Sequence, residues 1–191
     1  MMLKKSKIAC LILSLFILAV PIITTSTSIH AAEKSTSLQM ERNQVVSILK
    51  NNGYLEIDNQ AKTVKITQKY KEAVYEKLDS NHVAIFTENS VSIIPKDPLR
   101  AFSGVNKVVY TWKGYDLYLN STNANKAAAG IGIAGVLAAF IPDPIVSKAL
   151  AAALGIASGL IAYNNAAGRG VIIAYIGLPT SSSLPHWITS Q

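Results

Sequence analysis

The chain has 191 residues, half of them hydrophobic, and its 18 lysines and arginines outnumber its 11 acidic residues to give a formal charge of +7. A surface that binds nucleic acid usually concentrates Lys and Arg on one face, and the sequence has no such cluster, so a nucleic-acid partner is not expected. Cys10 is the only cysteine. A framework of disulfides and a cysteine-based metal site are therefore excluded.

Residues 1–32 are predicted to be a secretory signal peptide. Three lysines precede an uncharged, mostly apolar run over residues 8–23, and Ala32 supplies a small residue of the kind that signal peptidase accepts. An uncleaved membrane anchor is the alternative, because the run is almost long enough to span a bilayer. Cleavage removes Cys10 and three of the 18 basic residues, which leaves 15 basic against 11 acidic residues, or +4.

Residues 33–103 are predicted to form a small N-terminal α+β module. Apolar residues recur at helical spacing in two segments and alternate in four others, so the predicted order is helix, hairpin, helix, hairpin. The predicted helices span residues 38–50 and 67–78, and the predicted hairpins pair 54–57 with 63–66 and 83–86 with 91–94. Pro95 and Pro98 interrupt this pattern and mark the boundary with a C-terminal region, residues 104–191.

The C-terminal region is predicted to contain an apolar helical hairpin over residues 126–163. The first helix includes an uncharged run of fifteen residues, 127–141. A Pro-Asp-Pro turn follows, in which Asp143 caps the second helix and Pro144 takes its first position. The second helix is predicted to end near Tyr163. The predicted fold class is α+β.

Short flanking strands are predicted on either side of this hairpin, at residues 107–111 and 171–176. The tail, residues 178–191, contains two prolines and three serines before residue 186 and is predicted to be irregular.

Small residues are prominent in both predicted helices. Gly155 and Gly159 form a GxxxG pair, which lets another helix approach closely. The two helices are therefore expected to pack against each other as an antiparallel pair. Their environment stays open between a buried core, insertion into or docking on a membrane, and a permanent anchor, because each helix is shorter than the roughly 20 residues that a full span needs.

Aromatic and basic residues flank the predicted hairpin. Tyrosine and tryptophan favour the interface between hydrocarbon and water, and lysine is attracted to anionic headgroups. The candidates for membrane contact or interaction are Trp112, Lys113, Tyr115, Tyr118, Lys126, Lys148, Gly155, Gly159 and Tyr163. The alternative is that the rings of this set, together with Tyr110, pack against a sheet.

These segments carry a resemblance. Trp112-Lys113-Gly114, then Tyr118-Leu119 and a Gly/Ala-rich pair of helices around a Pro-Asp-Pro turn, resemble small secreted proteins of Gram-positive bacteria, some of them described as bacteriocin-like. The resemblance covers residues 1–32 and 105–176. It implies a Gram-positive cell, an extracellular site and bacteriocin-like activity on membranes.

Motifs of enzymes are missing from the sequence. His82 and His186 are the histidines outside the predicted signal peptide, and neither has a local partner motif. Asp58, Asp79 and Asp97 are predicted to be turn residues or caps. No catalytic residue, cofactor or metal site is predicted, and the protein is expected not to be an enzyme.

The sequence therefore predicts a secreted, non-enzymatic protein that acts at membranes through its apolar helical hairpin. The expected partner is anionic membrane lipid or a protein of the cell envelope. The alternative is a soluble extracellular or cell-envelope binding or structural module, including an immunity or accessory protein, whose core is the hairpin. The expected location is outside the cell, with association to the membrane or cell wall left open.

Overall fold

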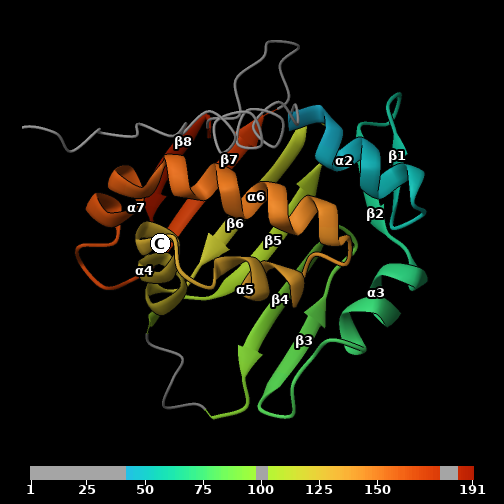
Figure 1. Ribbon diagram of the computed structural model, residues 1–191. Helices are drawn as coiled ribbons and strands as arrows, with labels where there is room; N and C mark the ends of the chain where they lie inside the picture. Colours follow the sequence, from blue (N-terminus) through green and yellow to red (C-terminus); the bar gives the residue numbers. More distant parts are fainter. Residues whose placement is uncertain (1–41, 98–102, 177–184) are drawn as a thin grey trace, which may run out of the picture.

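The computed structural model describes residues 42–97, 103–176 and 185–191, so the predicted signal peptide lies outside the described residues. The described part of the chain contains six helices and a six-stranded antiparallel sheet (Figure 1). The predicted α+β class is confirmed.

Along the chain, four helices follow one another between strands β6 and β7. The helices are α2 (Arg42–Asn51), α3 (Gln68–Tyr75), α4 (Ser121–Ala129), α5 (Ile133–Ala138), α6 (Pro144–Ile156) and α7 (Ser158–Asn164). The strands are β1 (Leu55–Asp58), β2 (Thr63–Ile66), β3 (His82–Phe86), β4 (Ser90–Pro95), β5 (Asn106–Thr111), β6 (Gly114–Leu119), β7 (Val171–Ile176) and β8 (Trp187–Ser190).

The main sheet has the strand order β3-β4-β5-β6-β7-β8, and every neighbouring pair is antiparallel. β4 pairs with β5, with Val91 opposite Val108, so the sheet continues across the boundary predicted between residues 103 and 104. The two predicted regions therefore contribute strands to one sheet. β1 and β2 form a separate two-stranded sheet.

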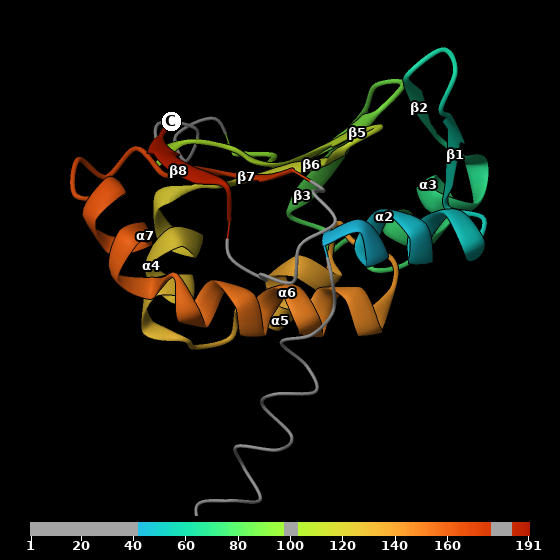
Figure 2. The same ribbon diagram turned by 90° about the horizontal axis from the view of Figure 1, so that it is seen from above.

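Helices α4 to α7 form a layer on one face of the main sheet, and no described helix covers the other face (Figure 2). Alternation in burial along β5 and β6 matches this arrangement, because one side of each strand packs on the helices and the other does not. The core between sheet and helices includes the fully buried side chains Leu117, Leu137, Leu154 and Ile161.

The prediction of two continuous helices is wrong, because both are broken. The first breaks between α4 and α5, where Gly130 and Gly132 adopt positive φ angles of 69° and 65°. Glycine adopts this left-handed conformation without steric penalty and so ends α4. The second breaks at Ala157, where α6 and α7 meet at a bend of 76°. The resulting layer places α5 beside α6 and α4 beside α7.

The turn between the two broken helices is held by the N-terminal part of the chain. Asp143 caps α6 as predicted, because its Oδ1 accepts hydrogen bonds from the backbone N–H groups of Ile145 and Val146 at 2.9 and 3.0 Å. The Asn52 side chain donates to Asp143 Oδ2 at 2.7 Å, and Lys77 donates to the Pro142 carbonyl at 2.7 Å. Hydrogen bonds between residues that are far apart in the sequence thus fix where α6 begins.

The prediction that the tail is irregular is wrong for its last part, because β8 pairs with β7. Gln191 then ties this edge of the sheet to the strand ends beside it. Its Nε2 donates to the carbonyls of Leu119 and Val105 at 2.8 and 3.0 Å, and its backbone N–H donates to Gly170 at 3.0 Å. Gly170, at a φ of 88°, lies so close to the Leu119 carbonyl that a side chain there would collide with it.

Candidate functional site

Helices α6 and α7 carry four exposed apolar side chains, and we call the surface formed by them the outer face. Ile145 and Ile156 lie on α6, and Leu160 and Tyr163 lie on α7 beyond the 76° bend. Leu160 is 61% exposed and Tyr163 is 80% exposed. Single exposed apolar residues are ordinary, but a row on one surface marks a site of interaction.

The glycines of the GxxxG pair lie on this exposed side. Gly155 and Gly159 are both exposed, and a Cβ built on either of them would meet no atom within 4 Å. The expectation that they form a tight contact between the two helices is therefore wrong. Instead they leave the outer face flat, because no side chain rises above the backbone at these positions.

The charge of the helical layer is positive and sparse. Between Ser121 and Asn164 the sequence has two basic residues, Lys126 and Lys148, and one acidic residue, Asp143. Both lysines are exposed, whereas Asp143 is buried beneath the start of α6. An anion that approaches the outer face therefore meets no exposed carboxylate of this layer.

Helix length limits how this face can meet a membrane. Within the described residues, no single helix has the length and apolar character that a membrane span requires. α6 and α7 reach that length and character only when they are taken together, across their bend of 76°.

The predicted aromatic candidates are not brought to the outer face, with the exception of Tyr163. Tyr115 is buried and stacks on Tyr175 at a centroid distance of 4.8 Å, so it belongs to the core, as does Tyr110. Trp112 lies in the turn between β5 and β6. The ammonium groups of Lys113 and Lys62 lie 4.8 and 5.6 Å from the Trp112 ring centroid, which places this turn near the β1–β2 hairpin.

Tyr118 also lies away from the outer face. It is half-buried on β6, opposite Lys107 of β5, whose ammonium group lies 5.8 Å from the ring centroid. The predicted set of contact residues therefore divides between the sheet and the helical layer, and Lys148, Gly155, Gly159 and Tyr163 are the members on the outer face.

A cavity of about 980 Å³ is the second candidate site. It opens between the sheet at β3 and β4 and the helices α4 and α5. Its apolar wall includes Ile93, Val136 and Phe140. Its polar residues are Asp79, His82, Ser103, Asn106, Asn120, Thr122, Asn123 and Lys126. The cavity is large enough for a small organic ligand.

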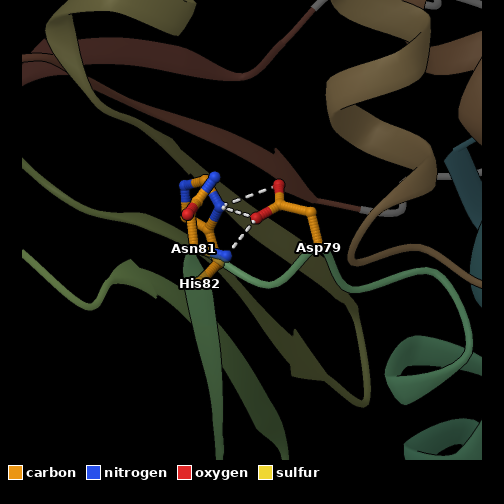
Figure 3. A network of polar contacts seen from close by, with 3 residues as sticks. All are labelled: Asp79, Asn81 and His82. Atoms are coloured by element: carbon orange, nitrogen blue, oxygen red, sulfur yellow. Dashed lines mark hydrogen bonds and ion pairs between the residues drawn. The ribbon is translucent and has the colours of Figure 1, made fainter.

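An aspartate and a histidine lie together at the edge of this cavity (Figure 3). His82 Nδ1 lies 2.8 Å from Asp79 Oδ1 and 2.9 Å from Oδ2, and the backbone N–H of Asn81 donates to Oδ1 at 2.8 Å. These hydrogen bonds hold the pKa of Asp79 below its ordinary value, and the bond with His82 has a larger effect than the bond from Asn81. Because a carboxylate only accepts, Nδ1 carries the proton and the histidine ring is fixed in orientation.

Sequence reasoning missed this pair, although the spacing of three residues across a turn was a usable indication. Asp79 acts as the predicted turn residue through its bond from Asn81, and it is also the local partner that His82 was thought to lack. In the described part of the chain, no three His, Cys, Asp or Glu side chains lie close enough to share a metal ion.

Three asparagines line the cavity, and two of them, Asn106 and Asn123, are buried. Asn106 Oδ1 accepts two hydrogen bonds at 3.0 Å, one from the backbone N–H of Asn120 and one from Asn123 Nδ2. Asn106 and Asn123 are 7% and 9% exposed. Lys126, which the sequence assigned to membrane contact, lines this same cavity one helical turn after Asn123.

Comparisons of the chain with models of protein families, with curated proteins and with solved structures gave no match. The function is therefore inferred from the two sites themselves.

Proposed function

We propose that the protein is exported and docks on an anionic membrane surface through the outer face of α6 and α7. The observation that carries the proposal is the exposed row Ile145, Ile156, Leu160 and Tyr163. Burial of one such side chain contributes roughly 1.5–3 kcal/mol, so a few of them together support stable binding at an interface.

Docking at the surface fits the helices better than a span across the membrane. α6 has 13 residues. At about 1.5 Å per residue this corresponds to roughly 20 Å, against a hydrocarbon core of about 30 Å. Because α7 turns away at 76°, the two helices do not form one longer rod. A helix with its apolar side in the interface and its other side in the protein needs no such length.

Charge favours lipid, rather than an apolar groove of another protein, as the partner of the outer face. Lys148 lies on α6 beside the apolar row, and each lysine near an anionic surface contributes about 1 kcal/mol. Exposed Gly155 and Gly159 place no side chain above the backbone on either side of the bend, so lipid can approach the backbone closely there. Tyr163 has the amphipathic ring that the interface prefers.

In this proposal the N-terminal α+β module, with α2, β1–β2, α3 and β3–β4, supports the helical layer. Asn52 and Lys77 hold the Pro142-Asp143 turn, so the module fixes the direction of α6. On the inner side of the layer, Leu154 and Ile161 are fully buried in the core. The outer face is thereby presented as a rigid surface.

The test is sedimentation with lipid vesicles. The protein is expressed with its own N-terminal segment in a secreting bacterial host, purified from the medium, and mixed with vesicles of phosphatidylglycerol and phosphatidylcholine. We expect it to sediment with these vesicles and much less with phosphatidylcholine alone. Leu160→Glu should weaken binding at least about tenfold, because it removes one buried leucine and adds a repelled charge. Higher salt should weaken binding as well.

Ile85→Glu is the matched control. Ile85 is 48% exposed and lies on β3, away from α6 and α7. This variant should bind vesicles as the unchanged protein does. Equal binding by Leu160→Glu would refute the assignment of the outer face. If the protein ignores all vesicles and stays a soluble, cooperatively folded monomer, the alternative of a soluble envelope module with these helices as its core replaces the proposal.

A further inference from the structure

We propose that the cavity between β3–β4 and α4–α5 binds a short peptide or N-acylated amino acid with a free carboxylate. The proposal is independent of membrane docking, because it concerns the other side of the helical layer. It rests on the two buried asparagines, Asn106 and Asn123, and on Lys126 beside them.

Hydrogen bonding fixes the orientation of both amide groups. The backbone N–H of Asn120 is a donor, so the Asn106 atom that it meets is the oxygen Oδ1. The Asn123 atom that meets the same oxygen must then be its nitrogen, Nδ2. Within the described residues, Asn106 Nδ2 and Asn123 Oδ1 are left without a hydrogen-bond partner.

Neither of these two atoms is fully enclosed by the protein. Both residues are more than nine-tenths buried, and both line the cavity. A free donor and a free acceptor on residues that line one cavity can both be met by a ligand that supplies the two complementary groups. The amide groups of a peptide supply both, since each has a C=O that can accept from Asn106 Nδ2 and an N–H that can donate to Asn123 Oδ1.

Lys126 identifies the second part of the ligand. It follows Asn123 by three residues on α4, so the two side chains start from the same face of the helix, about 5–6 Å apart at Cβ. In a peptide the last amide and the terminal carboxylate are separated by one Cα atom, a distance that the long lysine side chain can bridge. The Asp79 carboxylate on the far rim is already bound by His82 and by the Asn81 N–H.

The apolar residues of the cavity suit the remaining, apolar part of the proposed ligand. Ile93, Val136 and Phe140 also line the cavity, and they suit aliphatic or aromatic side chains or an acyl group. Gly132 and Gly135 also line it, and a Cβ at either position would meet no atom within 4 Å, so the α5 side of the cavity is open.

The experiment uses saturation-transfer NMR on the purified protein with a panel of N-acetyl dipeptides. The panel has free carboxylates and varies in aliphatic and aromatic side chains, and each member is compared with its C-terminal amide. We expect members of the panel to bind at millimolar or lower concentration, and their C-terminal amides to bind several-fold more weakly, because the amides lose the charge that meets Lys126.

Asn106→Asp is the critical variant. It keeps the oxygen that Asn120 and Asn123 donate to, and it replaces the Nδ2 donor that faces the ligand with an acceptor. Binding should weaken about tenfold or more, because the ligand's carbonyl then meets an oxygen. Lys126→Gln should weaken binding of the acids while it leaves binding of the C-terminal amides unchanged.

Asn59→Asp is the matched control, since Asn59 is exposed in the β1–β2 turn and should leave binding unchanged. Thermal melts of the variants confirm that each is folded, and Lys126→Gln provides the test if Asn106→Asp does not fold. The proposal is overturned if no panel member binds at millimolar concentration. It is also overturned if folded Asn106→Asp and Lys126→Gln bind as the unchanged protein does.

Discussion

The two sides of α6 and α7 are chemically alike but differ in what they contact. On the inner side Val146, Leu154 and Ile161 are completely buried in the core, while on the outer side Ile145 and Leu160 are each 61% exposed. Soluble helices ordinarily place charged and polar residues on the exposed side. The helical layer departs from this pattern, because Lys148 is the only charged residue between Pro144 and Asn164.

The difference shows that apolar residues serve two purposes within one helix. The inner residues determine the free energy of unfolding, because they are removed from water when the chain folds. The outer residues add almost nothing to folding in water, and they are the ones for which we propose a partner outside the chain. Substitutions of the same chemical kind on the two sides separate these purposes.

The largest contrast is expected between two leucine truncations. Leu154→Ala should reduce the free energy of unfolding by about 2–5 kcal/mol, because Leu154 is fully buried and its loss leaves a cavity. Leu160→Ala should change it by less than about 0.5 kcal/mol, since Leu160 is mostly exposed. Urea unfolding measures both. Similar losses for the two variants would show that the two sides are not distinct.

A second contrast compares two glycines. Gly170→Ala should destabilise the protein by roughly 1–3 kcal/mol, because the residue has a φ of 88° and faces the Leu119 carbonyl. Gly155→Ala should instead stabilise it by about 0.5–1 kcal/mol, since Gly155 is exposed in α6 with no atom near its Cβ position. Thermal or urea unfolding measures both changes in stability, which should have opposite signs. A destabilising Gly155→Ala would reveal a packing contact at the outer face.

The smallest expected change in stability concerns Asp116, on the face of the sheet that no described helix covers. Burial raises the pKa of Asp116 above its ordinary value of 3.8. The folded state therefore holds this proton at a pH where the unfolded chain has lost it, and stability falls as pH rises through that window. Asp116→Asn should raise the melting temperature slightly at pH 7 and leave it unchanged near pH 3. A gain of the same size at both values would contradict this account.

Local features of the fold could be predicted from the sequence. The cap at Asp143 and the strand 171–176 follow from neighbouring residues and are confirmed. The break of the first helix also had a local cause, because Gly130 and Gly132 lie two residues apart. β6 could have been recognised from the alternation of Tyr115, Leu117 and Leu119, which are all buried.

Features of the candidate sites depended on contacts between distant residues. Asn106 and Asn123 are 17 residues apart and meet only because β5 and α4 pack together. Asn52 and Asp143 are 91 residues apart. No periodicity encodes such contacts. The exposure of Gly155 and Gly159 was equally hidden, because a GxxxG pair has the same letters whether it faces a helix or solvent.

Fluorescence from a label on the outer face tests the central claim most directly. The sequence has no cysteine after Cys10, so the purified protein without the predicted signal peptide can carry one new thiol at a chosen site. Leu160→Cys and Ile85→Cys are each labelled with the environment-sensitive dye NBD. On addition of phosphatidylglycerol vesicles, the account predicts a blue shift and a brighter emission at position 160 and no change at position 85. Equal responses at both positions, or binding without a response at position 160, would contradict it.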